Sequence, residues 1–435
     1  MSNIDSTELL KGLSFCVIDL ETTGGNHEND QIIEIGMVRV KGLELSDEKN
    51  FLIDPGMRIP DFIQKLTSIK QRDVEGCPKI DEVIDEIIQF IGDDIIVAHN
   101  ISFDLPFLNS VLKRLGRPEL KNRNLCTNVM TKHMIPEIMS SNLNYMSQLF
   151  EIDHSKAHRA YDDARATAKL LLKFLEIFIQ KDIKKINQLY YPRNKFELDR
   201  IHFKNDHGQT EKALEAIANN ETSMSITLKG ERGLILGVLP IERPSEQMDI
   251  VKEFISGTEW ERLTIKLIKP ALEGLFQLNN HLLKFPEENK DLLLNYLNER
   301  YNVSDDKASE FNLEELDFVL AHHLVKDQII VYSFLNLNTN TKSIFKFPAQ
   351  RKKLINFLSS QSKKFEQKQK GKRKISIHKE VKPLIENFLA MRKSQNKYLF
   401  LTRKQLKESE SSTLKLIEAF NREDDMAYRF PTKHL

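Results

Sequence analysis

The first strongly apolar stretch of the chain ends in two acidic residues. Residues 14–20 (S-F-C-V-I-D-L) are rich in strand-forming residues and mostly apolar, a pattern that predicts a strand buried on both faces. Asp19 and Glu21 lie two positions apart at its carboxyl end, and alternate residues of a strand point to the same side. A bound divalent cation would offset the repulsion between these carboxylates, whereas a solvated strand end is the alternative.

The pattern that follows predicts a domain of mixed strands and helices. Further strands are expected at 31–40, at a stretch that ends at 51–53, and at 95–98. The first three strands should form a meander, because their connections are too short for crossover helices. Apolar residues at helical spacing predict helices at 61–69, 81–91, 102–115, 127–134, 143–150 and from Asp162 to about 175.

Two further acids and a histidine lie near predicted helix starts. Asp104 is in the first turn of a helix that Ser102 is predicted to cap, just after the strand at 95–98. His158 and Asp163 stand five residues apart around the start of the last long helix. Each has a structural alternative, because acids at a helix start favour the helix dipole and a lone histidine there is commonly a surface residue.

Three motifs in this order resemble the DEDD exonucleases of the His-containing branch. They are D-L-E-T-T-G at 19–24, H-N-I-S-F-D at 99–104 and H-R-A-Y-D-D-A at 158–164. Supporting matches are I-I-E-I-G at 32–36, I-P at 59–60, L-T-S-I at 66–69 and F-I-G-D at 90–93. Each motif alone is weak, and the three together are specific. Within this family, the chain looks similar to the proofreading epsilon subunit of bacterial DNA polymerase III and to the exonuclease domain of related replicative polymerases.

The resemblance covers about residues 11–180. It implies a ribonuclease-H-like mixed sheet flanked by helices, an α/β domain of mainly three layers with the acids at one edge of the sheet. The chain departs from the family pattern at Ser68, where a glycine is usual, and at Gly25. Both departures fall outside the acidic set.

The resemblance also implies a catalytic site. Asp19, Glu21, Asp104 and Asp163 would hold two ions of Mg²⁺ or Mn²⁺, with Asp19 bridging both, Glu21 and Asp163 completing one site and Asp104 serving the second. Carboxylates suit such hard cations, and two ions stabilise the attacking and leaving oxygens in phosphodiester hydrolysis. His158 would be the general base that takes a proton from water.

Other residues near these motifs are candidates for substrate contact. Thr22 and Thr23 are expected to offer backbone or hydroxyl donors to the terminal nucleotide, and Asn100 and Phe103 to contact the 3′ end. Stacking on an aromatic ring would tolerate any base, while a place in the core is the alternative for Phe103. The family spacing selects Asp163 over Asp162, which is expected to face solvent or to cap the helix.

The pattern of the rear half predicts an α+β region that we do not assign to a family. We expect the exonuclease domain at 1–180, a linker at 181–205 and an unassigned basic region for nucleic-acid or partner binding at 206–435. Hairpins are predicted at 223–240 and 328–348, and helices at 211–218, 290–301, 313–325 and 382–392.

Two segments of the rear half suggest partners. The basic residues at 351–353 and 363–374 would bind DNA phosphates, or they form a solvated loop. E-T-S-M-S-I at 221–226 faintly resembles a sliding-clamp peptide but overlaps a predicted strand.

Composition adds a charge asymmetry. The whole chain has a net charge of +1, but residues 1–180 carry 20 Lys and Arg against 28 Asp and Glu, and the remainder carries 44 against 35. A basic rear half could bind a polyanion, and ordinary solvated surfaces are the alternative.

Three cysteines without paired spacing predict reduced thiols in a cytoplasmic protein, and no apolar run indicates a membrane span.

The leading functional hypothesis is a metal-dependent 3′→5′ exonuclease that acts on the 3′ end of single-stranded DNA in proofreading or repair. The alternatives are an RNA-trimming exonuclease and a non-catalytic nucleic-acid-binding adaptor. A DNA polymerase subunit or a sliding clamp is the expected protein partner.

Overall fold

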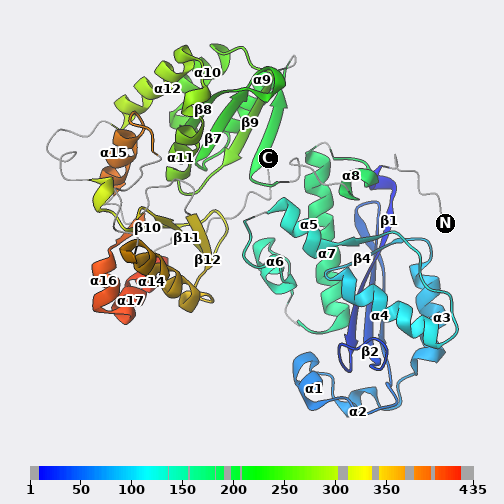
Figure 1. Cartoon of the computed structure of the whole chain (residues 1–435). Helices are drawn as coiled ribbons and strands as arrows, with labels where there is room; N and C mark the ends of the chain where they lie inside the picture. Colours follow the sequence, from blue (N-terminus) through cyan, green and yellow to red (C-terminus); the bar gives the residue numbers. More distant parts are fainter. Residues whose placement is uncertain are drawn as a thin grey trace. The chain divides into compact units, whose positions relative to one another are not determined.

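The computed structural model divides the chain into two compact units, Met1–Glu197 and Leu198–Leu435 (Figure 1). It describes residues 9–135, 137–154, 157–181, 183–190, 197–205, 208–301, 312–335, 342–367, 377–392 and 397–422.

The front unit is built on a five-stranded mixed sheet. Its strands are β1 (Ser14–Thr22), β2 (Ile32–Lys41), β3 (Glu44–Leu52), β4 (Ile95–Ala98) and β5 (Asn124–Cys126), in the order β3-β2-β1-β4-β5. The first three strands are antiparallel neighbours, and β4 and β5 continue the sheet in parallel with β1. The predicted meander is confirmed, and this order is the ribonuclease-H-like arrangement.

Helices cover both faces of this sheet (Figure 1). The helices of the front unit are η1 (Leu10–Gly12), α1 (Asp61–Thr67), α2 (Gln71–Val74), α3 (Ile80–Ile91), α4 (Ile101–Arg114), α5 (Thr127–Met134), α6 (Leu143–Leu149), α7 (Ala160–Gln180) and α8 (Ile186–Tyr190). Cys16, Ile18 and Leu20 of β1 share one core with α3 and α4. The intervening residues of β1, Asp19 and Glu21 included, therefore face the other side, where α7 packs on β1 and β2.

The start of α7 lies directly on β2 at Gly36. A Cβ atom at this position would stand 2.3 Å from the carbonyl oxygen of Ala160 and 2.4 Å from the backbone nitrogen of Tyr161. Gly36 is also the cross-strand partner of Asp19. The absent side chain therefore lets the beginning of α7 approach the sheet beside the first acid of β1.

Two local details differ from the helix pattern read in the sequence. Helix α4 begins at Ile101 with Asn100 in the cap position, so the predicted cap at Ser102 is wrong. The Ser102 hydroxyl instead donates to Asn100 Oδ1 at 3.2 Å, inside the first turn. Ser68, the departure from the family's glycine, ends α1 with a φ of 62°, the left-handed conformation in which glycine is least strained.

The rear unit contains two four-stranded sheets, β6-β9-β7-β8 and β12-β11-β10-β13. Its strands are β6 (Arg200–Lys204), β7 (Met224–Lys229), β8 (Ile235–Ile241), β9 (Arg262–Leu267), β10 (Phe318–His322), β11 (Gln328–Ser333), β12 (Lys342–Lys346) and β13 (Tyr398–Leu401). Its helices are α9 (Gln209–Ala218), η2 (Glu231–Gly233), η3 (Pro244–Glu246), α10 (Met248–Ser256), α11 (Leu272–His281), η4 (Leu282–Lys284), α12 (Glu287–Arg300), η5 (Leu313–Glu315), α14 (Arg351–Gln367), α15 (Lys382–Arg392), α16 (Arg403–Glu408) and α17 (Glu410–Arg422).

Most elements predicted in the rear half are confirmed. Strands β7 and β8 form the first hairpin, and β11 pairs with β12 as in the second, whose turn at 336–341 lies outside the described residues. The helix predicted at 313–325 is wrong. Only Leu313–Glu315 is helical there, and Phe318–His322 is the buried strand β10, whose short apolar run fits either structure by periodicity.

The segment that resembles a sliding-clamp peptide is part of a sheet. Met224, Ser225 and Ile226 are fully buried in β7, which lies between β9 and β8. A linear peptide motif must be accessible to its partner, so this segment does not dock a clamp in the folded protein.

The basic region is partly described. Lys363 and Lys364 are exposed on α14, while residues 368–376 lie outside the described part of the chain. Their binding to DNA phosphates stays a prediction.

The cysteines are all unpaired. Burial within β1 raises the pKa of the Cys16 thiol to about 12, which suits a structural residue.

Among the described residues, no helix has the length and apolar character needed to cross a membrane.

Replacing Gly36 with alanine should destabilise the front unit, because the new methyl group meets backbone atoms of α7 that cannot move independently. We expect a loss of about 1–3 kcal/mol in the free energy of unfolding, typical of overpacking. Urea denaturation measures it, with Gly12→Ala as the matched control, since a Cβ atom at Gly12 meets nothing within 4 Å. Equal stability of Gly36→Ala and the wild type would contradict the close approach of α7.

Candidate active site

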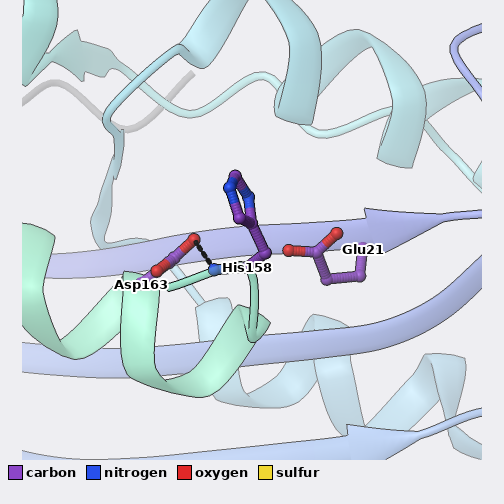
Figure 2. A group of neighbouring side chains, drawn as sticks. All are labelled: Glu21, His158 and Asp163. Atoms are coloured by element: carbon purple, nitrogen blue, oxygen red, sulfur yellow. Dashed lines mark hydrogen bonds between the residues drawn. The ribbon is translucent and has the colours of Figure 1, made fainter. Parts of the chain in front are cut away.

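Strand β1 presents the first two acids of the candidate site. Asp19 and Glu21 lie on its α7 face near the carboxyl end of the strand, as the spacing predicts. Figure 2 shows the Glu21 side chain beside His158, with Asp163 on the other side of the histidine. Ligand atoms of Glu21, His158 and Asp163 all lie within 4.8 Å of one another. Residues 137 positions apart in the chain thus meet at one point.

Asp104 reaches the same region from the first turn of α4. Its side chain is buried, and its Oδ1 accepts a hydrogen bond of 3.2 Å from the backbone N–H of Leu20, between the two acids of β1. This bond fixes the start of α4 to the end of β1. Burial, together with the charge of Asp163, raises the pKa of Asp104 to about 7 despite backbone hydrogen bonds that lower it.

The segment before α7 presents His158 and Asp163. The backbone N–H of His158 donates to Asp163 Oδ2 at 3.2 Å (Figure 2). His158 has a φ of 64°, in the left-handed region that costs a side-chain-bearing residue about 1 kcal/mol or more. The imidazole is exposed, and one of its ring nitrogens lies within 4.8 Å of a carboxylate oxygen of Glu21 and of Asp163.

An ion pair between a buried carboxylate and a partly exposed arginine holds the start of α7 on the sheet. Glu34, fully buried on β2, accepts from Arg159 Nε at 3.0 Å and from Arg159 Nη2 at 2.9 Å. The same carboxylate accepts from Ala160 N and from Asn50 Nδ2, each at 3.0 Å. Complete pairing is what makes a buried carboxylate tolerable. Glu34 is also the cross-strand partner of Glu21, so this contact fixes α7 next to the acids.

The clustered carboxylates disfavour one another's ionisation. Burial raises the pKa of Glu21 to about 8, and the charges of Asp163, Glu34 and Asp104 add to the effect. Burial likewise raises the pKa of Asp19 well above its usual value, with contributions from Asp104, Asp163 and Glu21. Ionisation of these buried and neighbouring carboxylates is unfavourable, and a bound cation would offset that cost. Their oxygen atoms are also the ligands that hard divalent ions prefer.

A second histidine at this site was missed by the sequence analysis. His154 Nε2 lies 2.5 Å from Asp163 Oδ1, and the His154 side chain is only 3% exposed. No predicted element or motif includes His154, so only its nearness to His158 in the sequence could have indicated it. Asp162 is the third residue of α7 and is not its cap, because the cap position belongs to Arg159.

The four residues predicted to contact substrate differ in their exposure and in their hydrogen bonds. The Thr22 hydroxyl donates to the Gly24 carbonyl at 2.7 Å, and the Thr23 hydroxyl donates to Asp30 Oδ1 at 3.1 Å, so both shape the loop after β1. Asn100 is exposed at the start of α4. Phe103 is half-buried, with its ring 5.7 Å from that of Phe107, and it packs against the core.

Comparisons with known proteins match the front unit to one family. A family model described as "Exonuclease" matches residues 16–171, inside the front unit. The epsilon subunit of DNA polymerase III from Aquifex aeolicus is 36% identical over 168 residues, which are 39% of this chain and 83% of that protein. The PolC-type DNA polymerase III of Clostridium perfringens is 38% identical over 180 residues. These are 40% of this chain but only 12% of the polymerase, so the chain spans a small part of that relative.

A solved structure gives a weaker likeness. Exonuclease X in complex with 5′ overhanging duplex DNA is 24% identical, with a TM-score of 0.33. The match covers 40% of this chain and 98% of that one.

The raised pKa values predict how stability depends on pH in a chelating buffer. Glu21 and Asp104 keep protons when folded that they release when unfolded, so their contribution is complete below about pH 4 and is lost as pH rises through about 7 to 8. Cations bind the ionised form and should restore this loss. We therefore expect Mn²⁺ to raise the melting temperature more at pH 8 than at pH 6.

Thermal melts at both pH values, with and without Mn²⁺, measure this effect. The variant Glu21→Gln with Asp104→Asn serves as the control, because it cannot ionise at either position and should lose most of the difference. An equal response of the wild type at pH 6 and pH 8 would argue against coupled ionisation and cation binding.

Proposed function

Because the chain belongs, through its front unit, to the DEDD exonuclease family that includes the epsilon subunit of DNA polymerase III, we propose that it is a metal-dependent 3′→5′ exonuclease acting on single-stranded DNA. It hydrolyses the last phosphodiester bond and releases a nucleoside monophosphate. The observation that carries the proposal is the meeting of four acids and a histidine from β1, α4 and the start of α7 at one end of the sheet.

The acids hold divalent cations in this proposal. Asp19, Glu21, Asp104 and Asp163 supply carboxylate oxygens for two Mg²⁺ or Mn²⁺ ions. Burial, together with neighbouring negative charges, raises the pKa values of Asp19, Glu21 and Asp104, which supports this role. Such ions neutralise charge on the attacking and leaving oxygens and acidify bound water when present. Asp19 serves both ions in this proposal, and its charge interacts with those of Asp104, Asp163 and Glu21.

His158 takes the proton from the attacking water. Its imidazole is exposed to solvent and lies beside Glu21 and Asp163, as a general base at an open site must. The left-handed backbone of His158 lets its N–H donate to Asp163 while its ring projects outward. One residue thus orients a carboxylate and offers a base.

The 3′ end of the strand would lie over the start of α4. Asn100 is exposed there, and Phe103 is only partly buried, so its ring is the candidate for stacking with a base. The Thr22 and Thr23 hydroxyls would have to exchange their loop hydrogen bonds for contacts with the nucleotide.

The polymerase relatives favour proofreading or DNA repair as the setting, with a polymerase subunit as the partner. The exposed lysines of α14 support a role of the rear unit in binding the DNA backbone.

The test is degradation of a 5′-labelled single-stranded DNA oligonucleotide by the whole chain. We expect a ladder that shortens from the 3′ end with Mg²⁺ or Mn²⁺ and stops with chelator. Asp19→Asn and Asp163→Asn should lose nearly all activity. His158→Asn should lose about 10²- to 10⁴-fold, the usual worth of a general base, with little loss of stability because asparagine tolerates positive φ.

Asp162→Asn is the matched control and should keep a rate near that of the wild type. Asp162 is not in the group of Glu21, His158 and Asp163, and its charge is not among those that raise the pKa values of Asp19, Glu21 and Asp104. An RNA oligonucleotide of the same sequence, run in parallel, separates the alternative substrate. Folded protein that degrades neither strand with either metal would refute the proposal and leave the non-catalytic adaptor.

A further inference from the structure

The carboxylate of Asp163 is held from both sides by residues of one short segment. Its Oδ2 accepts from the backbone N–H of His158 at 3.2 Å, and its Oδ1 lies 2.5 Å from Nε2 of His154. The His154 side chain is 3% exposed and that of Asp163 is 14% exposed. The second contact is therefore shielded from water, where a hydrogen bond orients a group most strongly.

The chemistry of the contact fixes the arrangement of protons. A carboxylate that binds a cation is ionised and can only accept hydrogen bonds. Nε2 of His154 must then carry the ring proton, so its N–H donates a hydrogen bond to Oδ1 of Asp163. Nδ1 of His154 is buried without a hydrogen-bond partner in the described part of the chain, so Asp163 is the polar group that this imidazole serves.

His154 and His158 differ in the way their roles require. His158 is exposed and its ring lies within the cluster with Glu21, whereas His154 is buried and reaches the cluster only through Asp163. Asp163 adds to the charge that Asp19, Glu21 and Asp104 experience, so repulsion opposes its place among them. A donor behind Asp163 counters that repulsion and leaves Glu21 and Asp163 aligned for a shared ligand.

We propose that His154 is a positioning residue that orients the Asp163 carboxylate and thereby sets the affinity of the acidic site for divalent cations. The inference rests on the proposed function, because it takes Asp163 to be a metal ligand. Partners of this kind typically change metal affinity by about 10- to 100-fold when they are removed.

The test is binding of Mn²⁺ to the whole chain without nucleic acid, followed by the electron paramagnetic resonance signal of free Mn²⁺. His154→Leu removes the donor at similar size and should weaken Mn²⁺ binding by about 10- to 100-fold. His154→Gln keeps an N–H near the position of Nε2 and should restore most of the affinity. His133→Leu, at an exposed histidine of α5, should bind Mn²⁺ like the wild type.

A second variant guards against misfolding of His154→Leu. His154→Asn is polar but too short to reach Asp163, so it should bind Mn²⁺ weakly while melting near the wild-type temperature. Metal titration of the nuclease gives a further readout: saturating Mn²⁺ should recover the rate of His154→Asn but not that of His158→Asn.

The outcomes separate the two proposals. Wild-type Mn²⁺ affinity in folded His154→Leu and His154→Asn would overturn the role of His154 and leave the exonuclease proposal intact. Equal weakening by His154→Asn and His154→Gln would overturn the role as well, since donation to Asp163 would then not matter. A wild-type chain that binds no Mn²⁺ would overturn both.

Discussion

The burial of several carboxylates close together is the constraint on which the rest of the front unit depends. Burial and neighbouring charges raise the pKa values of Asp19, Glu21 and Asp104, so holding these groups together costs free energy in the absence of a cation. The fold meets this cost with contacts directly behind the acids. The Leu20 N–H anchors Asp104, and the Glu34–Arg159 pair fixes the start of α7, which carries Asp163.

These supports explain the I-I-E-I-G motif in physical terms. In the register of β1 and β2, Glu34 lies opposite Glu21 and Gly36 lies opposite Asp19. Glu34 accepts the donors that the start of α7 presents, and Gly36 removes the side chain that would keep α7 away. Two positions that carry no catalytic chemistry thus decide whether the acids of distant segments meet. The site is therefore a property of the β1–β2–α7 packing as much as of the acids themselves.

The sequence predicted the front unit well because its motifs combine local pattern with chemistry. The spacing of Asp19 and Glu21 already implied a shared face, and the apolar stripes located the helices that bring Asp104 and Asp163 near them. The role of His154 could not be predicted from a sequence pattern. Its contact with Asp163 depends on the course of the backbone before α7, and no apolar periodicity or motif includes His154. The helix expected at 313–325 failed for a related reason: Phe318–His322 is too short for its period to separate strand from helix.

The central claim is that the four acids that meet near the end of β1 form a single site for two cations and that this site serves phosphodiester hydrolysis. Anomalous diffraction from crystals of the whole chain soaked with Mn²⁺ and a nucleoside monophosphate tests it most directly. The account predicts two peaks among the carboxylates of Asp19, Glu21, Asp104 and Asp163, with the phosphate beside them. Clear density for these side chains with no anomalous peak between them, at a Mn²⁺ concentration that supports activity, would contradict it.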